Sequence, residues 1–233
     1  MNAILRPAAE RGHANHGWLD THHSFSFANY YDPRHMGFRS LRVINDDVIK
    51  PGAGFGRHGH RDMEIFTYVV SGELTHQDSL GSRRVLRRGD VQVMSAGTGI
   101  EHSEFNGSAS AEVHLLQIWI EPQARGGQPG YADYTIPEAA KRNQLALLAG
   151  PAACGALATL GQDARIYASL LDKGLAVRHE IAAGRAAWLQ MINGALSADG
   201  IALSPGDGLA VQAAGAITLT ASEDSEFLLF DLA

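Results

Sequence analysis

Cysteine is almost absent from this chain of 233 residues, which contains only Cys154. A single cysteine excludes an intramolecular disulfide and is typical of a reducing compartment, so we expect a cytoplasmic protein. Basic residues are not in excess either. The formal net charge is -6 and the lysines and arginines are scattered. This pattern excludes the positive surface typical of nucleic-acid binding, so no nucleic-acid partner is expected.

Long hydrophobic runs are also missing. The most apolar stretch, residues 145–160, is interrupted by Gly150, Pro151 and Gly155 and cannot cross a bilayer as a regular helix. Residues 1–17 are polar and lack the apolar core of a secretory signal, so we expect no membrane partner. Aromatic residues make up only 7%, whereas there are 26 glycines, which indicates many turns between short elements.

Short apolar segments separated by glycine dominate the first half. Residues 41–49, 65–70 and 113–120 have the β-branched and apolar composition of strands, and turn signals recur every eight to twelve residues. This spacing predicts an all-β sandwich or barrel. Residues 137–148 are the one stretch that predicts a modest helix.

The second half repeats the first in outline. Residues 188–194 resemble residues 66–72, a strand that ends in glycine, and residues 204–211 resemble residues 88–93, a Gly-Asp turn followed by a strand. Such a repeat predicts two similar β-barrels in tandem. We assign residues 1–122 to the first domain, the Gly- and Pro-rich residues 123–137 to a linker, and residues 138–233 to the second domain.

Two pairs of potential metal ligands occur at a spacing of two residues. His58 and His60 form one pair, and His102 and Glu104 form the other. Side chains at i and i+2 of a strand point to the same face, so each pair directs two donors into one space. Three imidazoles and a carboxylate suit a divalent transition metal. Glu64 has the same parity as the first pair, so parity alone leaves Glu64 and Glu104 as competing oxygen ligands unless a turn at residues 62–63 intervenes.

The remaining histidines lack this paired spacing. His76 precedes a turn and is either a hydrogen-bonded strand-end residue or a catalytic one. His114 lies within an apolar strand and is expected to be structural. His179 is placed in the second half much as His58 is in the first, but it has no partner, so we expect one metal per chain. Five others belong to an irregular N-terminal region and are expected to be structural or exposed: His13, His16, His22, His23 and His35.

Two longer motifs carry a family resemblance. Gly52-x5-His58-x-His60-x3-Glu64-x7-Gly72 and Gly89-x5-Ser95-x-Gly97-x4-His102 resemble the two cupin motifs. Four further segments, residues 18–33, 41–47, 76–79 and 94–104, resemble the pirin family, and within it the bacterial pirin-like quercetinases. The likeness is strong over residues 1–120 and looser in the tail.

The resemblance implies a bicupin, an all-β fold of two tandem double-stranded β-helix (jelly-roll) barrels with few short helices. It implies one divalent metal in the first barrel, with His58, His60, His102 and Glu104 as ligands. Glu64 then becomes a second-layer residue. Iron is the first expectation for the metal, and copper, nickel, cobalt, manganese and zinc also suit the donors.

The resemblance also implies an activity, that of a quercetin 2,3-dioxygenase. The metal would act as a Lewis acid on the 3-oxygen of a flavonol, Glu104 would take the 3-hydroxyl proton, and O₂ would open the ring with release of carbon monoxide. Aromatic residues are expected either to wall the substrate pocket or to pack in the core: Phe25, Phe27, Tyr30, Tyr31 and Phe55. The alternatives are a non-enzymatic, metal- or redox-sensing regulator that binds a protein partner, and a cupin enzyme acting on a small acid or sugar.

Overall fold

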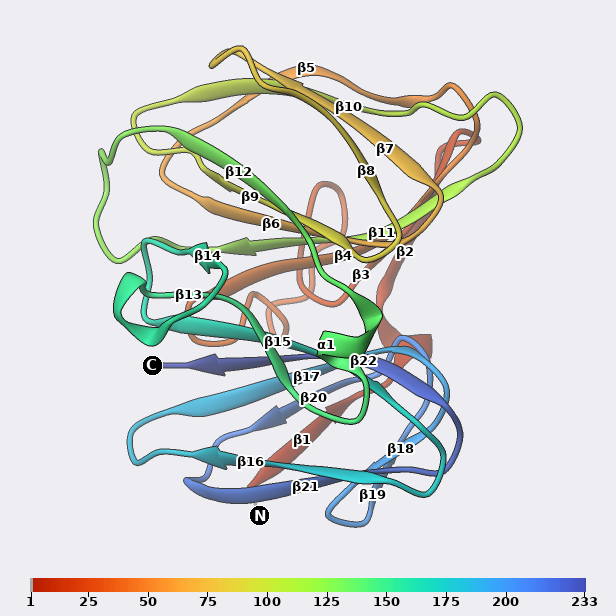
Figure 1. Cartoon of the computed structure of the whole chain (residues 1–233), viewed down its shortest axis with the longest axis vertical. Coiled ribbons are helices and arrows are strands. Elements are labelled where there is room, and N and C mark those ends of the chain that lie inside the picture. The colour runs from red at the N-terminus through yellow and green to blue at the C-terminus, as the bar shows by residue number, and fades with distance from the viewer. Residues whose placement is uncertain (1) are drawn as a thin grey trace.

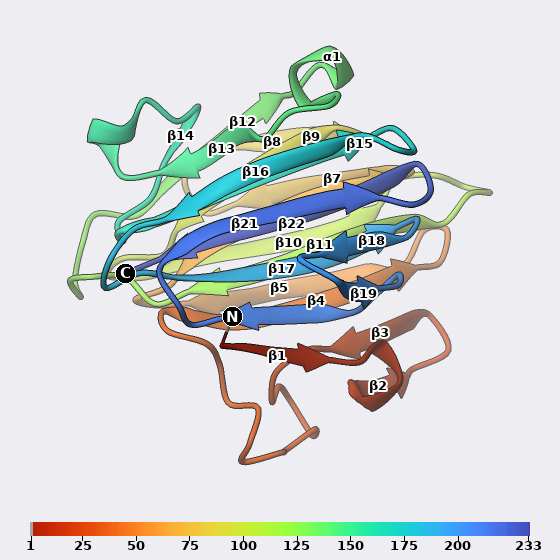
Figure 2. The ribbon, with the colours of Figure 1, turned by 90° about the horizontal axis from the view of Figure 1, so that it is seen from below.

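The computed structural model describes residues 2–233 and consists of two β-barrels stacked on each other. Four sheets form four layers, with a seven-stranded sheet of each barrel in the middle and a four-stranded sheet on each outer side (Figure 1). The view from below shows the strands of successive layers running roughly side by side (Figure 2). The predicted all-β bicupin architecture is confirmed.

The first barrel pairs an outer sheet with an inner one. The outer sheet has the order β5 (Gly54–His60), β10 (Ile100–Asn106), β7 (Glu73–Asp78) and β8 (Arg83–Arg87). The inner sheet has the order β12 (Gly130–Thr135), β9 (Asp90–Ser95), β6 (Glu64–Ser71), β11 (Val113–Ile120), β4 (Leu41–Ile49), β3 (Leu19–His23) and β2 (Gly12–Asn15).

The second barrel repeats this plan. Its inner sheet has the order β1 (Ala3–Arg6), β20 (Gly208–Val211), β17 (Ala186–Asn193), β22 (Ser225–Leu232), β15 (Ala164–Leu171), β13 (Ala146–Gly150) and β14 (Ala158–Thr159). Its outer sheet has the order β16 (Ala176–Ile181), β21 (Gly215–Ala221), β18 (Leu196–Ala198) and β19 (Ile201–Leu203).

The predicted repeat is visible in the strand pairing. Strand β6 lies between β9 and β11, and β17 lies between β20 and β22 in the same way. Both central strands end at a glycine with positive φ, Gly72 at 81° and Gly194 at 81°. A Cβ at Gly72 would lie 2.4 Å from the carbonyl oxygen of Glu112, and one at Gly194 would lie 2.2 Å from that of Asp224. Both turns therefore require glycine for the same two reasons.

The chain crosses between the two barrels in ways that the sequence does not announce. Strand β1 belongs to the inner sheet of the second barrel, where Ala3 to Arg6 pair with β20, although residues 1–122 were assigned to the first domain. Part of the predicted linker forms β12, which pairs with β9 of the first barrel. Both departures arise because an edge strand is stabilised by any sheet that offers unpaired backbone groups, whatever its position along the chain.

Helix is scarce. The helix predicted over residues 137–148 is only one turn, α1 (Glu138–Lys141), and residues 146–150 form β13 instead. Short 3-10 turns occur at Ala8–Glu10 and Ala152–Cys154. None of the helices in residues 2–233 has the length and apolar character needed to cross a membrane.

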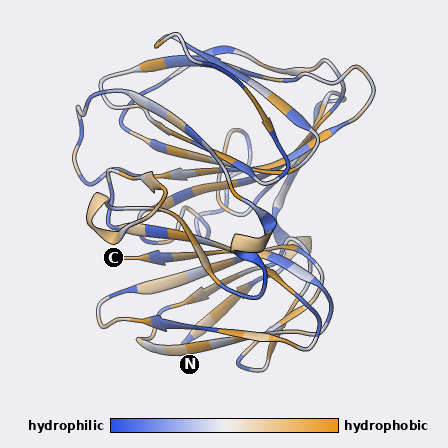
Figure 3. Cartoon of the chain, viewed as in Figure 1, coloured by the Kyte–Doolittle hydropathy of each residue, from blue (hydrophilic) through white to orange (hydrophobic). Residues whose placement is uncertain are grey.

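The largest hydrophobic core lies between the two barrels. Alternate residues of β6, Phe66, Tyr68 and Val70, pack in one cluster with side chains of the second barrel such as Ile166 and Phe230. The intervening residues of β6 point the other way, into the first barrel. Figure 3 shows hydrophobic segments in the inner strands on both sides of this core, interspersed with hydrophilic ones. Because β6 is buried on both faces, it is a continuous apolar run rather than an alternating one.

A buried polar chain crosses this core. The ammonium of Lys141 donates to the hydroxyl of Tyr68 at 2.8 Å, and that hydroxyl donates to Glu226 at 2.7 Å. Arg88 donates to the other Glu226 oxygen at 3.2 Å. These hydrogen bonds join the first barrel to β22 of the second, where Glu226 pairs with Arg88 and reaches Lys141 through the Tyr68 hydroxyl.

Candidate metal centre

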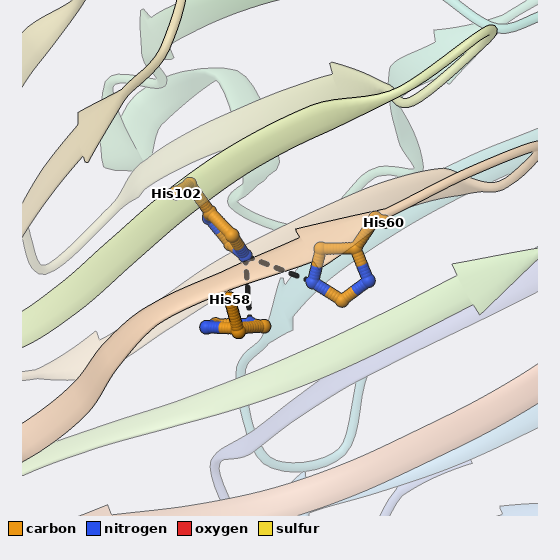
Figure 4. A group of neighbouring side chains, drawn as sticks. All are labelled: His58, His60 and His102. Carbon is orange, nitrogen blue, oxygen red and sulfur yellow. Dashed lines mark hydrogen bonds between the residues drawn. The ribbon is translucent and has the colours of Figure 1, made fainter.

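Three histidines converge between β5 and β10. The two strands pair antiparallel with His102 directly opposite His58, and His60 follows two residues later on the same strand. The Nε2 atom of His102 lies 3.0 Å from Nε2 of His58 and 2.9 Å from Nε2 of His60 (Figure 4). Three ring nitrogens directed at one point form the arrangement that a metal ion requires of its imidazole ligands.

Backbone geometry brings the two strands to this distance. The register between β5 and β10 shifts between His102 and Glu104, which is a β-bulge of the kind that redirects side chains next to functional sites. At the start of β5, a Cβ on Gly54 would lie 2.2 Å from the carbonyl oxygen of Glu104. Gly54 therefore lets the backbones approach at the site, whereas a Cβ on Gly59, between the histidines, would meet nothing closer than 3.8 Å.

The three imidazoles are in the form that binds metals. The Nδ1 atom of His58 lies 2.8 Å from the carbonyl oxygen of Gly56, which can only accept, so Nδ1 carries the proton and Nε2 of the neutral ring presents its lone pair. Burial and the charge of neighbouring histidines lower the pKa of His60 to about 4. Burial is also the main cause that lowers the pKa of His102 to about 4. Neutral rings are therefore expected for His60 and His102 at neutral pH.

Glu104 lies beside this group and is held from two sides. It is fully buried, and both carboxylate oxygens accept from amides: Oε1 from Gln92, and Oε2 from Gln117 at 2.9 Å. Thr67 donates to the Gln117 oxygen and accepts from Gln92 at 3.0 Å, which fixes the orientation of both amides. Glu104 and His102 also form a second compact group of donors with His76.

The charge of Glu104 is set by its neighbours. Burial opposes ionisation, but the nearby His76 and His102 rings outweigh it and hold the pKa of Glu104 below its ordinary value. His76 is itself buried, stacks on Tyr131 at 4.3 Å between ring centres, and bonds to Asp78 at 2.9 Å. Burial lowers the pKa of His76, but the Glu104 and Asp78 carboxylates reverse this and raise it. Glu104 is therefore an ionised carboxylate, and the neighbouring imidazole of His76 favours that ionised form.

A cavity of about 430 Å³ opens onto His58, His60 and Glu104. Four aromatic side chains line it: Trp18, Phe27, Phe55 and Trp119. Phe27 meets Trp119 edge to face at 5.3 Å between ring centres, and Phe55 meets Trp18 in the same way at 5.3 Å. A cavity lined by four aromatic rings, with the candidate metal ligands His58, His60 and Glu104 on its wall, suits an aromatic ligand.

The structure brings most, but not all, of the predicted residues to this place. Phe27 and Phe55 line the cavity, and His76 lies behind Glu104. Phe25 does not reach the cavity, because it packs against Trp188 in the core between the barrels. Tyr31 is exposed, and the Tyr30 hydroxyl instead accepts from Arg6.

Glu64 also lies away from the histidines. The chain turns at Asp62, where φ is 49°, so that β5 ends at His60 and the strand parity starts again at β6. On β6, Glu64 shares the face of Phe66 and Tyr68, which points to the second barrel. Its carboxylate accepts from Ser95 at 2.7 Å and lines a separate cavity between the barrels. The prediction of a second-layer role at the histidines does not match this position.

The other histidines have partners of their own. His114 lies 2.6 Å from Asp46, and His179 lies 2.8 Å from Asp231 in the second barrel. Asp231 also pairs with Arg185. His179, the residue that corresponds to His58, is therefore part of a polar network and not of a metal-ligand group of the described residues. His13 and His22 stack on each other across the β2–β3 hairpin.

Sequence reasoning missed the residues that hold Glu104 and two walls of the cavity. Gln92 and Gln117 are single amides inside apolar strands, and each shares its strand face with inward-pointing residues. A polar residue in such a run was the available signal, because buried amides need partners. Trp18 and Trp119 carried no comparable signal.

Fold and site together define a class, that of two-barrel cupins with a histidine-rich candidate metal centre in the first barrel. A sequence model of the pirin family, described as "Pirin", matches residues 5–120. A second model, described as "Quercetinase C-terminal cupin domain", matches residues 147–232.

Individual relatives agree over almost the whole chain. Quercetin 2,3-dioxygenase of Escherichia coli (strain K12) is 50% identical over 228 residues, which cover 98% of this chain and 97% of the relative. A pirin-like protein of Caulobacter vibrioides is 41% identical over 229 residues, which cover 98% of each. This chain belongs to the pirin family.

Solved structures support the same assignment. The crystal structure of YhhW from Escherichia coli matches with a TM-score of 0.95 and 48% identity over 99% of this chain and 97% of that one. The structure of bacterial pirin YhhW in complex with nickel(II) matches with a TM-score of 0.93 and 49% identity over 99% of this chain and 98% of that one.

Proposed function

We propose that this protein is a metal-dependent dioxygenase that cleaves a flavonol with O₂, in the manner of quercetin 2,3-dioxygenases. The observation that carries the proposal is the convergence of three Nε2 atoms at the corner of an aromatic-walled cavity, beside a buried ionised carboxylate. The identity of 50% to a protein named quercetin 2,3-dioxygenase supports the substrate class.

The donor set fits a divalent transition metal. His58, His60 and His102 would hold it through their Nε2 atoms, and we propose Glu104, which lines the same cavity, as the fourth ligand. When bound, the metal supplies Lewis acidity toward a ligated oxygen and a route for O₂ chemistry. Iron, copper, nickel, cobalt, manganese and zinc all accept these donors, and a related pirin binds nickel(II). We keep iron as the first expectation.

The protein's own residues supply orientation and proton transfer. The Trp119 and Phe55 rings form walls against which a flat phenolic ring stacks. Glu104 is ionised and faces the cavity, so it is the group that accepts the proton of the 3-hydroxyl. Gln92 and Gln117 hold its two oxygens, and the bonded amides limit how far the carboxylate turns.

A direct experiment combines metal analysis with turnover. Freshly purified protein is analysed for metals, depleted, and reloaded with each divalent metal in turn. We expect O₂ uptake, loss of the flavonol absorbance and release of carbon monoxide with at least one metal. Glu104→Ala should abolish all three, whereas Glu64→Gln, a carboxylate outside the cavity, should retain them.

Two other outcomes would contradict the proposed dioxygenase activity. If no metal supports flavonol turnover, and the protein instead binds another protein tightly in a metal-dependent way, the regulatory alternative replaces the dioxygenase. Turnover of a small acid or sugar in place of a flavonol would instead favour the second alternative, a cupin enzyme of another type.

A further inference from the structure

A second cavity of about 270 Å³, called the side chamber below, shares part of its lining with the cavity at the histidines. Both spaces are lined by Asp47 and Asn45, and the rings of Trp18, Phe27 and Phe55 border both. Thr21 lines the side chamber but not the cavity at the histidines. A ligand that reaches the metal corner therefore has a second, partly aromatic space within reach.

Two polar groups in this chamber have no hydrogen-bond partner in the described protein. They are Oδ1 of Asp47 and the hydroxyl of Thr21, and both side chains are nearly inaccessible, with 2% and 3% of their surface exposed. The Thr21 hydroxyl nevertheless stands close enough to Asp47 to oppose the rise in the pKa of that carboxyl. They belong to neighbouring strands, where Thr21 of β3 and Asp47 of β4 stand directly opposite each other. Leaving one buried polar group unpaired costs about 1–3 kcal/mol, so two neighbouring groups without a fully formed hydrogen bond, beside a cavity, are candidates for bonding to a ligand.

The neighbouring polar residue in the chamber is already engaged. Oδ1 of Asn45 accepts a buried hydrogen bond from Nδ1 of His23 at 2.7 Å. Asp46, adjacent in sequence, points to the other face of β4, where it binds Arg11 at 3.0 Å and His114 at 2.6 Å. Asp47 and Thr21 are thus the residues lining this chamber that have a buried side-chain atom without a fully formed hydrogen bond.

We propose that the side chamber is a recognition site for a hydroxylated ring of the substrate, with Asp47 and Thr21 bonding to a phenolic hydroxyl. The inference rests on the proposed function, because it takes the substrate to be a flavonol. It makes Asp47 a specificity-determining residue that selects polyhydroxylated flavonols over those whose outer rings carry no hydroxyl.

The chemistry of the two groups suits this task. A phenolic O–H is a strong donor and a carboxyl oxygen its natural acceptor, while the threonine hydroxyl can donate to or accept from the same group. Burial is the main cause that raises the pKa of Asp47 to about 7. The flanking rings would hold the substrate ring by stacking. A site built around a hydroxyl discriminates strongly against the analogue that lacks it, because its own polar groups are then left unpaired.

The test compares the kcat/KM of two substrates in three proteins. The substrates are quercetin and 3-hydroxyflavone, which lacks every hydroxyl except the reacting one. The proteins are the wild type, Asp47→Leu and the matched control Asp46→Asn, whose carboxylate faces away from the chamber. We expect the wild type and the control to prefer quercetin in kcat/KM by at least about tenfold, chiefly through KM. In Asp47→Leu the ratio should fall close to one.

Equilibrium binding supplies a readout that does not need turnover. The dissociation constants of both flavonols are measured by quenching of tryptophan fluorescence in metal-depleted protein, where Trp18 and Trp119 lie at the cavity. The same loss of preference is expected there for Asp47→Leu and, to a smaller extent, for Thr21→Val. Asp47→Asn keeps the shape and part of the hydrogen-bonding capacity, so it should retain part of the preference. Thr21→Val stands in if the leucine variant does not fold, and an unchanged preference in Thr21→Val then overturns the proposal.

The outcomes separate the two proposals. If the wild type cleaves flavonols but the preference for quercetin survives in Asp47→Leu, the side chamber is not the recognition site, and the proposed function stands. If the wild type cleaves no flavonol with any metal, the proposed function fails. The binding preference for quercetin then tests the side chamber without turnover. Loss of this preference in Asp47→Leu supports a site for phenolic hydroxyls, and an unchanged preference overturns the proposal.

Discussion

The amide of Gln117 donates to Oε2 of Glu104 at 2.9 Å, and through this bond the inner sheet of the first barrel holds a group of the outer sheet. Gln117 lies on β11 and Glu104 on β10, so the bond spans the barrel interior. The carboxylate next to the histidines therefore takes its direction from a strand that carries no ligand. The same amide is oriented by Thr67 of β6.

We predict that Gln117→Leu lowers turnover without removing the metal. A hydrogen bond to a charged group contributes about 1.5–3 kcal/mol, so kcat should fall by roughly 10- to 100-fold while the three histidines still bind metal. Flavonol turnover and metal content, measured on the same preparation, check this. Gln144→Leu, at an exposed glutamine, is the matched control. Loss of metal in step with activity would show instead that Gln117 maintains the ligands.

We predict that His102→Ala abolishes metal retention. His102 is the ring whose Nε2 atom lies close to both other Nε2 atoms, so its removal takes the common member from the three-nitrogen group. Metal content after dialysis, with His114→Ala as control, measures the effect; His114 is bound to Asp46 outside this group. Full metal content in His102→Ala would assign the metal to other residues.

We predict that Tyr68→Phe destabilises the contact between the barrels. The substitution removes the hydroxyl that links Lys141 to Glu226 and leaves both charges buried with one partner fewer. The free energy of unfolding should fall by about 1–3 kcal/mol, as measured by urea denaturation. Tyr31→Phe, at a side chain that is 73% exposed, should change it by less than about 0.5 kcal/mol. If Tyr68→Phe and Tyr31→Phe change the free energy of unfolding equally, the Tyr68 hydroxyl does not stabilise the contact between the barrels.

We predict a pH-dependent cost for Asp231→Asn. Burial opposes ionisation of Asp231, but His179 and Arg185 outweigh it and hold the pKa below 3.8. A carboxyl with a depressed pKa contributes stability that is present above the unfolded value and is lost as the pH falls through the folded value. The variant should therefore be less stable than wild type at pH 7, by about 1–3 kcal/mol, because Arg185 and His179 lose a charged acceptor while Arg185 keeps Asp163 as a partner. The difference should shrink below pH 3.8 in urea titrations at stepped pH, and a difference independent of pH would contradict this account.

Spacing within one strand was the most reliable signal in the sequence. The pairs His58/His60 and His102/Glu104 follow from period two alone, and the structure places the three histidines within reach of one another. The glycine-terminated strands of both halves were likewise visible, because the turns at Gly72 and Gly194 demand the same residue for the same steric reason. Such features depend only on neighbours along the chain.

Relations between faces could not be predicted in the same way. Glu64 has the right parity relative to the histidines, but the turn at Asp62 resets it, and β6 has two buried faces between which local pattern cannot choose. The helix predicted over residues 137–148 gives way to β13 because pairing with β15 outweighs the helix propensity of a short segment. Tertiary contacts decided both cases.

The sequence by itself determined the strand-rich repeat, the donor types and the spacing that puts two donors on one face of each strand. The tertiary structure alone decided which faces meet: that Glu104 is held by Gln92 and Gln117, that Glu64 points to the second barrel, and that Thr21 stands opposite Asp47 in the side chamber. The physical reason is range. Backbone periodicity and turn sterics act within a few residues, whereas the burial and pairing of polar groups depend on strands far apart in the chain.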